Sequence, residues 1–252
     1  MNLRFLGIIP ARYASTRLSA KPLADIGGKS MIHRVMERAA MAEGLLELVV
    51  ATDDQRIFDH VVSLGGHAVM TDVSHPSGTD RCYQALCALG EDRYDAVVNI
   101  QGDEPFLVPA QVDELCSTLA AAPSGLATLA HHLTDDNDLD DPGKVKITTD
   151  LHGDALYFSR AAIPVLRNPV SSPRHAAHRF LKHIGLYAYR TEVLAKLVSL
   201  KPSSLELAES LEQLRWLENG YKVRVGLTAH PSFCVDTPAD LEEARRLAAQ
   251  EG

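Results

Sequence analysis

The sequence predicts an α/β protein with a mostly parallel mixed sheet flanked by helices. Short apolar runs alternate with amphipathic stretches of helical period along the first hundred residues. Strands that alternate with helices of about 10–15 residues are typical of βαβ units and a parallel sheet. The chain has 252 residues, of which 46% are hydrophobic and 23% charged. These values fit one large packed core, so we expect a single domain over residues 1–252.

The first half of the chain carries the clearest alternation of strands and helices. Expected strands cover residues 5–9, 46–51, 67–71 and 96–100. Expected helices cover residues 30–43, a stretch after Asp54 that ends at residue 64, and residues 78–89. Ser30 is a residue type that commonly caps a helix N-terminus. The segment Gly27-Gly28-Lys29-Ser30 lacks the spacing of a phosphate-binding P-loop, so we expect a turn there.

The second half predicts a different organisation, with more strands and fewer helices between them. Strands are expected at residues 126–131, 145–149, 155–158 and 184–189, which indicates a mixed-strand portion at roughly 126–190. Residues 168–179 lack periodicity and predict a mobile or ligand-ordered loop. Helices near 191–200 and 204–218, a strand at 222–227 and a closing helix after Pro238 complete the pattern.

Composition excludes several classes of protein. The net charge of −8 and the isoelectric point near 5.7 argue against general binding to nucleic acid. No apolar stretch approaches the ~20 residues of a membrane span, and the N-terminus does not resemble a signal peptide. Four scattered cysteines form no C-x-x-C pair, which argues against a disulfide framework or a zinc site. We therefore expect a cytoplasmic protein without nucleic-acid or membrane partners.

A basic loop follows the first strand. Arg12, Arg17 and Lys21 lie in the loop that leaves the carboxyl end of the strand at residues 5–9. Open α/β sheets bind ligands at this edge. Three cations in a chain of net charge −8 favour a small polyanion such as a nucleoside triphosphate, although a solvated basic loop is an alternative.

Two aspartates stand where a divalent cation could bind. Asp103 follows the expected strand at 96–100, and Asp236 precedes the closing helix. Mg²⁺ binds phosphates through one or two carboxylates and several waters. Thr237 already serves as the helix cap with Asp240 three residues on, which leaves Asp236 for another task. The alternatives are a turn-forming Asp103 and an Asp236 that only adds charge near a helix N-terminus.

Polar residues before two helices predict further contacts with a ligand. Ser77 and Gly78 can approach a flat base closely, because glycine has no side chain. Arg81 lies in the first turn of its helix, where a cation opposes the helix dipole and calls for an anionic partner, either a protein carboxylate or a ligand phosphate. Glu212 and Gln213 could bind a polyhydroxylated ligand, although a solvated helix face is the commoner explanation.

Taken together, these segments resemble the 3-deoxy-manno-octulosonate cytidylyltransferase family. The matching segments are residues 10–22, 75–81, 98–105, 155–164, 183–190, 209–215 and 235–241. They follow the family's order and run nearly from end to end. The opening motif alone fits several sugar nucleotidyltransferases. The added combination of Ala155-Leu156-Tyr157-Phe158-Ser159-Arg160 with Glu212-Gln213-Leu214-Arg215 is much more specific.

The resemblance implies a Rossmann-like nucleotide-diphospho-sugar transferase fold. It implies transfer of CMP from CTP to the anomeric hydroxyl of 3-deoxy-manno-octulosonate with release of pyrophosphate, for lipopolysaccharide biosynthesis. The alternatives are a cytidylyltransferase for an 8-amino-octulosonate or a nonulosonate, a nucleotide-binding module without catalysis, and a glycosyltransferase. The family is typically homodimeric, with the contact in the mixed-strand portion.

The resemblance also implies a role for each matching residue. The triphosphate ligands would be Arg12, Arg17 and Lys21; Ser77, Gly78 and Arg81 would face the cytidine; Asp103 and Asp236 would hold Mg²⁺; and Gln101, Arg160, His183, Tyr187, Glu212 and Gln213 would line the sugar pocket. Catalysis would rest on Arg12, Lys21, Asp103 and Asp236, because neutralised charge and positioning dominate such reactions. The sequence indicates no dedicated general base.

The chain departs from the family's pattern at two places. The family usually has Arg-Leu-Pro-Gly-Lys-Pro where this chain has Arg17-Leu18-Ser19-Ala20-Lys21-Pro22. The loss of proline loosens the loop and alanine does not readily adopt a positive φ, so the sequence leaves the loop geometry open while its charges are kept. Residues 140–144 also replace an Asn-Pro-Asn type of segment.

Overall fold

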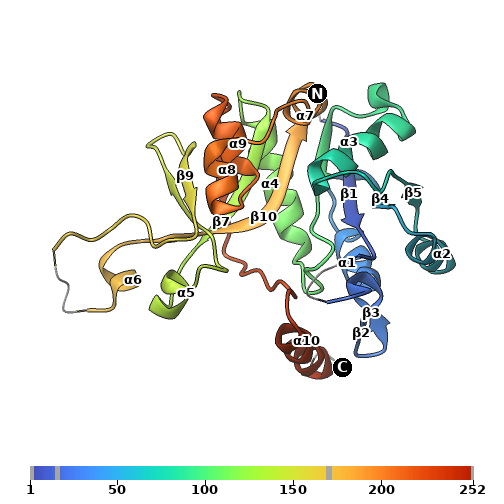
Figure 1. Ribbon diagram of the computed structural model, residues 1–252, viewed down its shortest axis with the longest axis horizontal. Helices are drawn as coiled ribbons and strands as arrows, with labels where there is room; N and C mark the ends of the chain where they lie inside the picture. Colours follow the sequence, from blue (N-terminus) through green and yellow to red (C-terminus); the bar gives the residue numbers. More distant parts are fainter. Residues whose placement is uncertain (1–2, 15–17, 169–171, 251–252) are drawn as a thin grey trace.

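A central mixed sheet organises the computed structural model, which describes residues 3–14, 18–168 and 172–250 (Figure 1). In the described residues nine strands join in the order β11-β7-β10-β6-β1-β4-β5, with β8 paired to β10 and β9 paired to β8. The strands are β1 Phe5–Ala11, β4 Leu45–Thr52, β5 Ala68–Met70, β6 Ala96–Asn99, β7 Leu126–His132, β8 Lys146–Thr149, β9 Ala155–Ser159, β10 Leu181–Arg190 and β11 Arg224–Leu227. The predicted fold class is confirmed.

The first half supplies the parallel part of the sheet. β1 pairs in parallel with β4 on one side and with β6 on the other. β10 then inserts antiparallel between β6 and β7. The carboxyl ends of β1 and β6 therefore meet at the same edge as the start of β10, which brings loops from both halves of the chain together.

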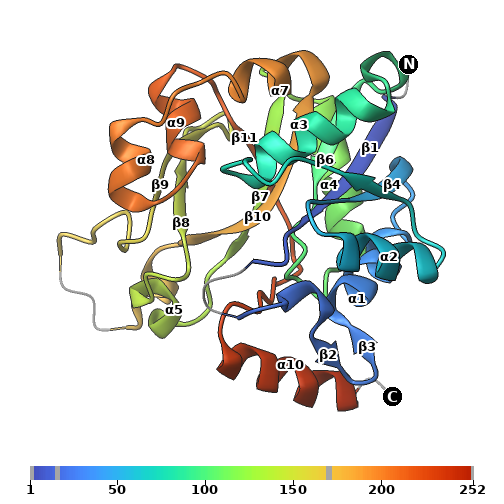
Figure 2. The same ribbon diagram turned by 45° about the vertical axis from the view of Figure 1, so that its right-hand side comes forward.

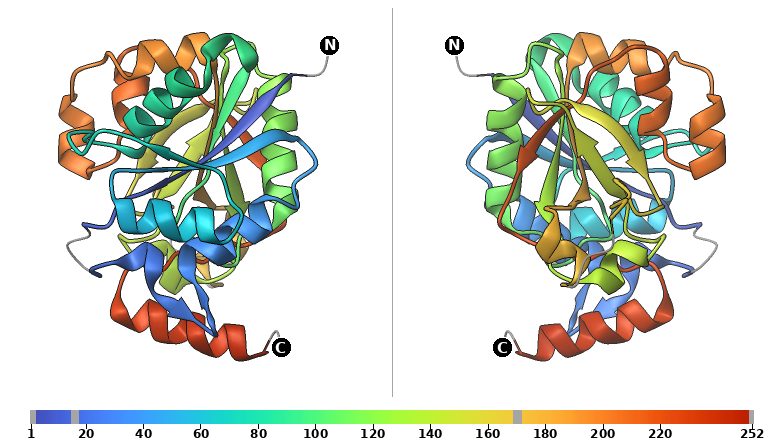
Figure 3. Two further views of the ribbon diagram at one scale, coloured as in Figure 1. Left: turned by 90° about the vertical axis from the view of Figure 1, so that its right-hand side faces the viewer. Right: turned by 90° about the vertical axis from the view of Figure 1, so that its left-hand side faces the viewer.

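Helices cover both faces of the sheet (Figure 3). They are α1 Met31–Ala39, α2 Gln55–Ser63, α3 Gly78–Leu89, α4 Pro109–Ala120, α5 Asp136–Asp140, α6 Arg174–Ala177, α7 Thr191–Leu197, α8 Ser204–Glu209, α9 Gln213–Glu218 and α10 Pro238–Gln250. One apolar core packs α1, α2 and α4 on one face, and a second packs α3, α7 and α9 on the other. Each face buries its apolar side chains from water, which is the main source of stability.

The predicted turn before α1 is a β-hairpin. β2 Asp25–Ile26 pairs with β3 Lys29–Ser30, and Gly27 and Gly28 at its tip have φ values of 61° and 80°. Two consecutive positive φ values suit glycine, which has no Cβ to clash. The hairpin packs against α10 in a small separate core (Figure 2). Ser30 caps α1 as predicted, because its hydroxyl accepts the backbone N–H of His33.

Several elements differ from the sequence prediction. The helix expected over 204–218 is broken into α8 and α9, and Ser210 between them adopts a left-handed conformation with φ 51°. α6 forms within the segment expected as a loop. α4 was not predicted, although Val112, Leu115 and Leu119 have helical spacing.

The mixed-strand portion at 126–190 is continuous with the rest of the sheet. It contributes β7 and β10 to the centre, while β8, β9, α5 and α6 project at one end (Figures 1 and 2). A minor apolar cluster of Leu133, Leu139 and Phe180 holds the projecting part together. None of the helices in the described residues has the length and apolar character needed to cross a membrane.

Candidate active site

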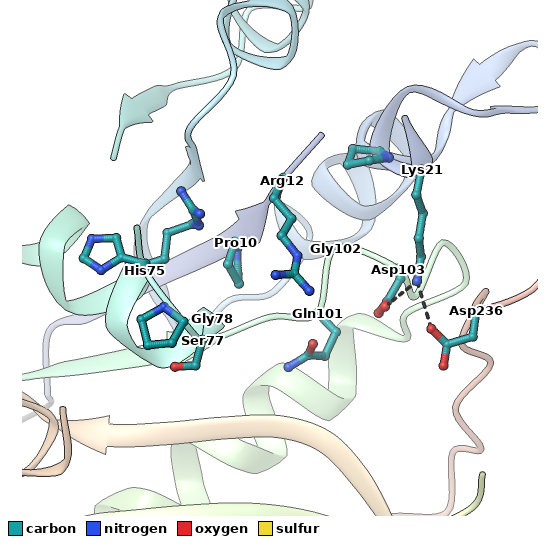
Figure 4. Close-up of a pocket in the computed structure, with 14 residues that line it drawn as sticks. Pro10, Arg12, Lys21, His75, Ser77, Gly78, Gln101, Gly102, Asp103 and Asp236 are labelled. Atoms are coloured by element: carbon teal, nitrogen blue, oxygen red, sulfur yellow. Dashed lines mark hydrogen bonds and ion pairs between the residues drawn. The ribbon is translucent and has the colours of Figure 1, made fainter. Parts of the chain in front are cut away.

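A pocket opens where the carboxyl ends of β1 and β6 meet the closing segment of the chain (Figure 4). It is lined by Pro10, Ala11, Arg12, Lys21, Pro22, His75, Pro76, Ser77, Gly78, Arg81, Gln101, Gly102, Asp103 and Asp236. The loop that carries Ser77 and Gly78 forms one end, and Lys21 with the two aspartates forms the other (Figure 4). Residues more than two hundred positions apart in the chain therefore share one cavity.

Lys21 joins the two aspartates predicted to bind a metal. Its Nζ donates to Asp103 Oδ2 at 2.7 Å and to Asp236 Oδ1 at 3.1 Å. Burial alone lowers the pKa of Lys21, but the neighbouring charges, above all the charge and hydrogen bond of Asp103, outweigh burial and raise that pKa. Lys21 is therefore a fixed positive charge at neutral pH.

The two aspartates fit a divalent cation. A carboxylate oxygen from each, together with Cys234 Sγ, lies within a group whose atoms are all within 4.8 Å of one another. The backbone N–H of Val235 donates to the carbonyl of Asp103 at 2.9 Å, which fixes the two loops side by side. Mg²⁺ prefers oxygen ligands and commonly uses one or two carboxylates, so Asp103 and Asp236 suit it and the thiol does not.

The basic loop keeps a tight turn despite its altered sequence. Ala20 adopts φ 55° and ψ 26°, and its N–H donates to the carbonyl of Tyr13 at 3.2 Å. The expectation that alanine would not readily take a positive φ here is wrong, because the hydrogen bond and the following short helix at Lys21–Leu23 hold the backbone in place. Arg12 points into the pocket (Figure 4), whereas Arg17 lies outside the described residues.

The loop at residues 75–78, which the sequence predicts to face the nucleotide and which is called the nucleotide loop below, is anchored at the start of α3. Ser77 caps the helix by accepting the N–H of Asp80 at 3.2 Å. A Cβ on Gly78 would lie 3.3 Å from Pro10 and 3.8 Å from Asn99 Nδ2, so glycine lets the loop pack closely on β1 and β6. Ser77 and Gly78 both line the pocket, as the sequence predicts for residues that face a ligand.

Arg81 finds a protein carboxylate as its partner. Its Nη2 donates to Asp53 Oδ2 at 2.7 Å, and its Nη1 donates to the hydroxyl of Thr71. The side chain is only 4% exposed, yet the residue lines the pocket. The choice left open by the sequence is thereby resolved, since Asp53 compensates the cation within the first turn of α3. A ligand phosphate is not needed to explain it.

Glu212, which is 135 positions from Ser77 in the sequence, contacts the N-terminus of α3. Its carboxylate accepts from Ser77 Oγ at 2.9 Å and from Thr79 Oγ1 at 2.8 Å. Burial and the charge of Asp80 raise the pKa of Glu212, against the opposing effect of these hydrogen bonds and Arg215. The interpretation of this helix face as merely solvated is therefore wrong at Glu212.

His183 and Tyr187 lie against each other but do not line the pocket. The ring of His183 packs edge-on against Phe158, with 5.2 Å between centroids, and lies 5.2 Å from the ring of Tyr187. Its Nε2 lies 3.0 Å from the hydroxyl of Thr128. Burial and the charge of Lys182 lower the pKa of His183 to about 3, so the imidazole is neutral at physiological pH.

Of the remaining residues predicted for the sugar pocket, one lines the pocket described above and two do not. Gln101 lines the pocket and donates to the carbonyl of Gly185 at 2.8 Å. Arg160 and Gln213 do not line it. Arg160 Nε donates to the carbonyl of Glu209 at 2.6 Å, and Gln213 is buried at the start of α9. Arg160 contacts Glu209 and Ser210, and Gln213 directly follows Glu212, which does not line the pocket either.

Sequence reasoning missed three residues that hold the site. Asp53 and Thr71 orient Arg81, and Thr79 binds Glu212. Asp53 carried a usable signal, because it follows a buried strand as Asp103 does. Thr71 and Thr79 carried none, since a hydroxyl's partner depends on packing between segments distant in sequence.

The Rossmann-like sheet, the cationic loop and the paired carboxylates define a nucleotidyltransferase. A family model described as Cytidylyltransferase matches residues 6–225. A 3-deoxy-manno-octulosonate cytidylyltransferase of Parabacteroides distasonis is 49% identical, covering 98% of this chain and 99% of the relative. The equivalent protein of Bacteroides thetaiotaomicron is 51% identical, covering 97% and 98%. The chain belongs to the 3-deoxy-manno-octulosonate cytidylyltransferase family.

Solved structures agree with this assignment. A CMP:2-keto-3-deoxy-manno-octonic acid synthetase complexed with CTP superposes with a TM-score of 0.90 and 43% identity, covering 99% of this chain and 100% of the other. A glucose-1-phosphate thymidylyltransferase from Bacillus anthracis has a TM-score of 0.63 at 18% identity, covering 97% and 95%, and supports the fold alone.

Proposed function

We propose that the enzyme transfers CMP from CTP to the anomeric hydroxyl of 3-deoxy-manno-octulosonate and releases pyrophosphate. The observation that carries the proposal is one pocket with a close-packed nucleotide loop at one end and Lys21 held by two carboxylates at the other. This polarity suits a nucleoside triphosphate, with the base near Ser77 and Gly78 and the phosphates near Lys21. The named relatives support the choice of octulosonate as acceptor.

Fixed positive charge would serve the chemistry. Attack on the α-phosphorus brings three phosphates and a sugar carboxylate together, and their negative charge must be neutralised. Lys21 is held in place by Asp103 and Asp236, and Arg12 projects into the same pocket. Preorganised charge of this type is commonly the largest single contribution to catalysis. We assign Arg17 to the same role on the resemblance of its loop.

Asp103 and Asp236 would hold Mg²⁺ beside the phosphates. When bound, the cation would neutralise phosphate charge and lower the pKa of a coordinated hydroxyl. No protein base is assigned, because the anomeric hydroxyl is more acidic than an ordinary alcohol. His183, with a pKa near 3, is too weak a base to collect the proton at neutral pH.

The sugar would bind on the side of the pocket formed by Gln101, which donates to Gly185 of β10, and Ser77, which donates to Glu212. We assign Gln101, Arg160, His183, Tyr187, Glu212 and Gln213 to this part of the site. Among the described residues, the buried hydroxyl of Tyr187 has no hydrogen-bond partner, so it is available to a polar ligand. The neutral imidazole of His183 and the amide of Gln101 can likewise bind sugar hydroxyls without adding charge.

The acceptor is tested by measuring pyrophosphate release with CTP, Mg²⁺ and a panel of sugar acids. We expect octulosonate to give the highest kcat/KM, with 8-amino-octulosonate and a nonulosonate lower. Highest activity with either of the others would transfer the assignment to that sugar. CTP binding without any turnover would instead favour a binding module, and failure to consume free CTP would favour a glycosyltransferase.

We further propose a cytoplasmic homodimer that supplies lipopolysaccharide biosynthesis. All four cysteines are free thiols, as expected in a reducing compartment. Leu151 is fully exposed at the turn before β9, and Leu156 on β9 is 61% exposed. Exposed apolar side chains in the mixed-strand portion favour a contact with a second copy. Light scattering on the purified protein should give twice the 27.4 kDa chain mass.

A further inference from the structure

One carboxylate connects the two parts of the proposed active site. Glu212 is assigned to the sugar part of the site. Both of its carboxylate oxygens nevertheless accept hydrogen bonds from the N-terminus of α3, one from the capping residue Ser77 and one from Thr79. Oε1 is bound by Ser77, which lines the pocket, and Oε2 is bound by Thr79, which does not. Thr79 is 3% exposed and lies behind the pocket wall.

Thr79 is the firmer of the two anchors. Ser77 Oγ lies 2.6 Å from Asp80 Oδ2 and 2.9 Å from Glu212 Oε1, but a serine hydroxyl has a single proton to donate. The two carboxylates therefore compete for it. Thr79 Oγ1 donates to Glu212 Oε2 at 2.8 Å and also interacts with the hydroxyl of Tyr189, whose own proton leaves the Thr79 proton for Glu212. A hydrogen bond to a buried charged group is stronger than one between neutral groups.

Two tyrosines of β10 adjoin the segment that carries Glu212. Tyr187 and Tyr189 project from the same face of β10, and both rings pack edge-on against Trp216, which follows Glu212 in α9. Burial, with a smaller contribution from the charge of Glu212, raises the pKa of both tyrosines, so both hydroxyls are protonated. The Tyr187 hydroxyl is buried without a hydrogen-bond partner in the described residues, whereas the Tyr189 hydroxyl interacts with the side chains of Thr79 and Asn99. An unsatisfied buried hydroxyl such as that of Tyr187 favours a polyhydroxylated ligand on this side.

We propose that Thr79 is a positioning residue that couples the nucleotide and sugar sites through Glu212. The hydrogen bond from Thr79 holds the Glu212 carboxylate in one orientation. In that orientation the carboxylate can bind a sugar hydroxyl and also holds Ser77 in place beside the nucleotide. Without this hydrogen bond, a buried carboxylate beside Asp80 would turn away and disturb both sites. The inference rests on the proposed function, because it assigns the two sides of Glu212 to the two substrates.

The test compares Thr79, which donates to Glu212, with Thr71, which accepts from Arg81. Thr79→Val keeps the side chain's shape and removes its hydroxyl. We expect about a tenfold weaker Kd for CTP, measured by calorimetry without sugar, and about a tenfold higher KM for octulosonate. Thr79→Ser should restore both values. Thr71→Val removes a hydroxyl that holds Arg81 and should weaken CTP binding alone.

The outcomes separate coupling from a local packing effect. Near-UV circular dichroism establishes that each variant is folded, and Thr79→Ala serves as a second variant without the hydroxyl. Unchanged affinity for both substrates would overturn the inference, and so would weakening of CTP alone, as expected for Thr71→Val. If wild-type protein failed to turn over octulosonate, the proposed function would fail. Calorimetry with CTP and with the sugar acid separately would then still decide whether Thr79 affects both ligands.

Discussion

The two ends of the proposed site are built differently. At the phosphate end, charged groups stand at the rim in ion pairs, and the side chains of Asp103 and Asp236 are 26% and 40% exposed. At the sugar end, His183 and Tyr187 pack against aromatic rings, Glu212 accepts from two hydroxyls, and burial disfavours the charged form of all three. The phosphate end is suited to bind charged ligands from solution. The sugar end is suited to recognise hydroxyls in a fixed geometry.

This contrast explains which variants should affect rate and which should affect recognition. Removing a rim charge leaves the fold intact, because solvent can take its place, but it removes the field that stabilises the transition state. Removing a buried polar partner leaves another group unsatisfied and so costs stability as well as affinity.

The largest expected effect is loss of turnover in Asp103→Asn. The amide keeps the size of the side chain but removes the charge that would hold the metal and Lys21. We expect kcat to fall on the order of a thousandfold with an unchanged melting temperature. Steady-state pyrophosphate release measures it, with the exposed Asp59→Asn as the matched control. A near-normal rate in Mg²⁺ would contradict the metal assignment.

Removal of Lys21 should have the next largest effect. Lys21→Met keeps the aliphatic stem and deletes a charge that lies between two carboxylates. We expect kcat/KM for CTP to fall about a hundredfold, because the phosphates lose a fixed partner. Lys29→Met, which loses a surface pair with Glu37, should behave as wild type. Equal losses in the two variants would mean that only net charge matters.

Asp53→Asn should act on recognition and stability rather than on the chemical step. The variant leaves the buried Arg81 guanidinium uncompensated. We expect KM for CTP to rise about tenfold with little change in kcat, and the free energy of unfolding to fall by about 3 kcal/mol. Denaturant titration and kinetics provide both values. The neighbouring Asp54→Asn is the control, since its partner Arg56 is 60% exposed and asparagine also caps helices.

The smallest expected effect concerns pH and His183. Its folded pKa near 3 lies below the usual value of 6.5, so between these values the unfolded chain binds a proton that the folded protein does not. The free energy of unfolding should therefore rise with pH through this window, and this contribution is lost as pH falls. Between pH 7.5 and 5.5 the loss is about 1 kcal/mol. His183→Phe keeps an aromatic ring and should flatten this part of the profile; an identical slope would show that the imidazole already titrates normally.

Sequence reasoning was most successful where local pattern determines structure. The strand at Phe5–Ala11, the helix Gly78–Leu89 and the Ser30 cap follow from periodicity and capping chemistry. The prediction of Arg81's anionic partner followed from the helix dipole, although its identity did not. Ala20 escaped prediction because a hydrogen bond to Tyr13 outweighs an intrinsic backbone preference.

The remaining features depend on contacts between distant segments. The break at Ser210 separates α8 from α9, and Glu212 at the start of α9 meets Thr79 across 133 positions of sequence. No periodicity in either segment encodes that pairing. The grouping of Lys21, Asp103 and Asp236 was inferred from strand ends and resemblance, and their direct hydrogen bonds required coordinates.

In the proposed reaction, the anomeric hydroxyl attacks the α-phosphorus of CTP. This step is tested by mass spectrometry of the product formed from octulosonate whose anomeric oxygen carries a heavy isotope, in the presence of CTP and Mg²⁺. We predict a CMP-octulosonate that retains the label in its bridging oxygen, with unlabelled pyrophosphate. Two results would contradict this reaction. One is a CMP-sugar that lacks the label although the unreacted sugar has kept it; the other is the absence of any CMP-sugar.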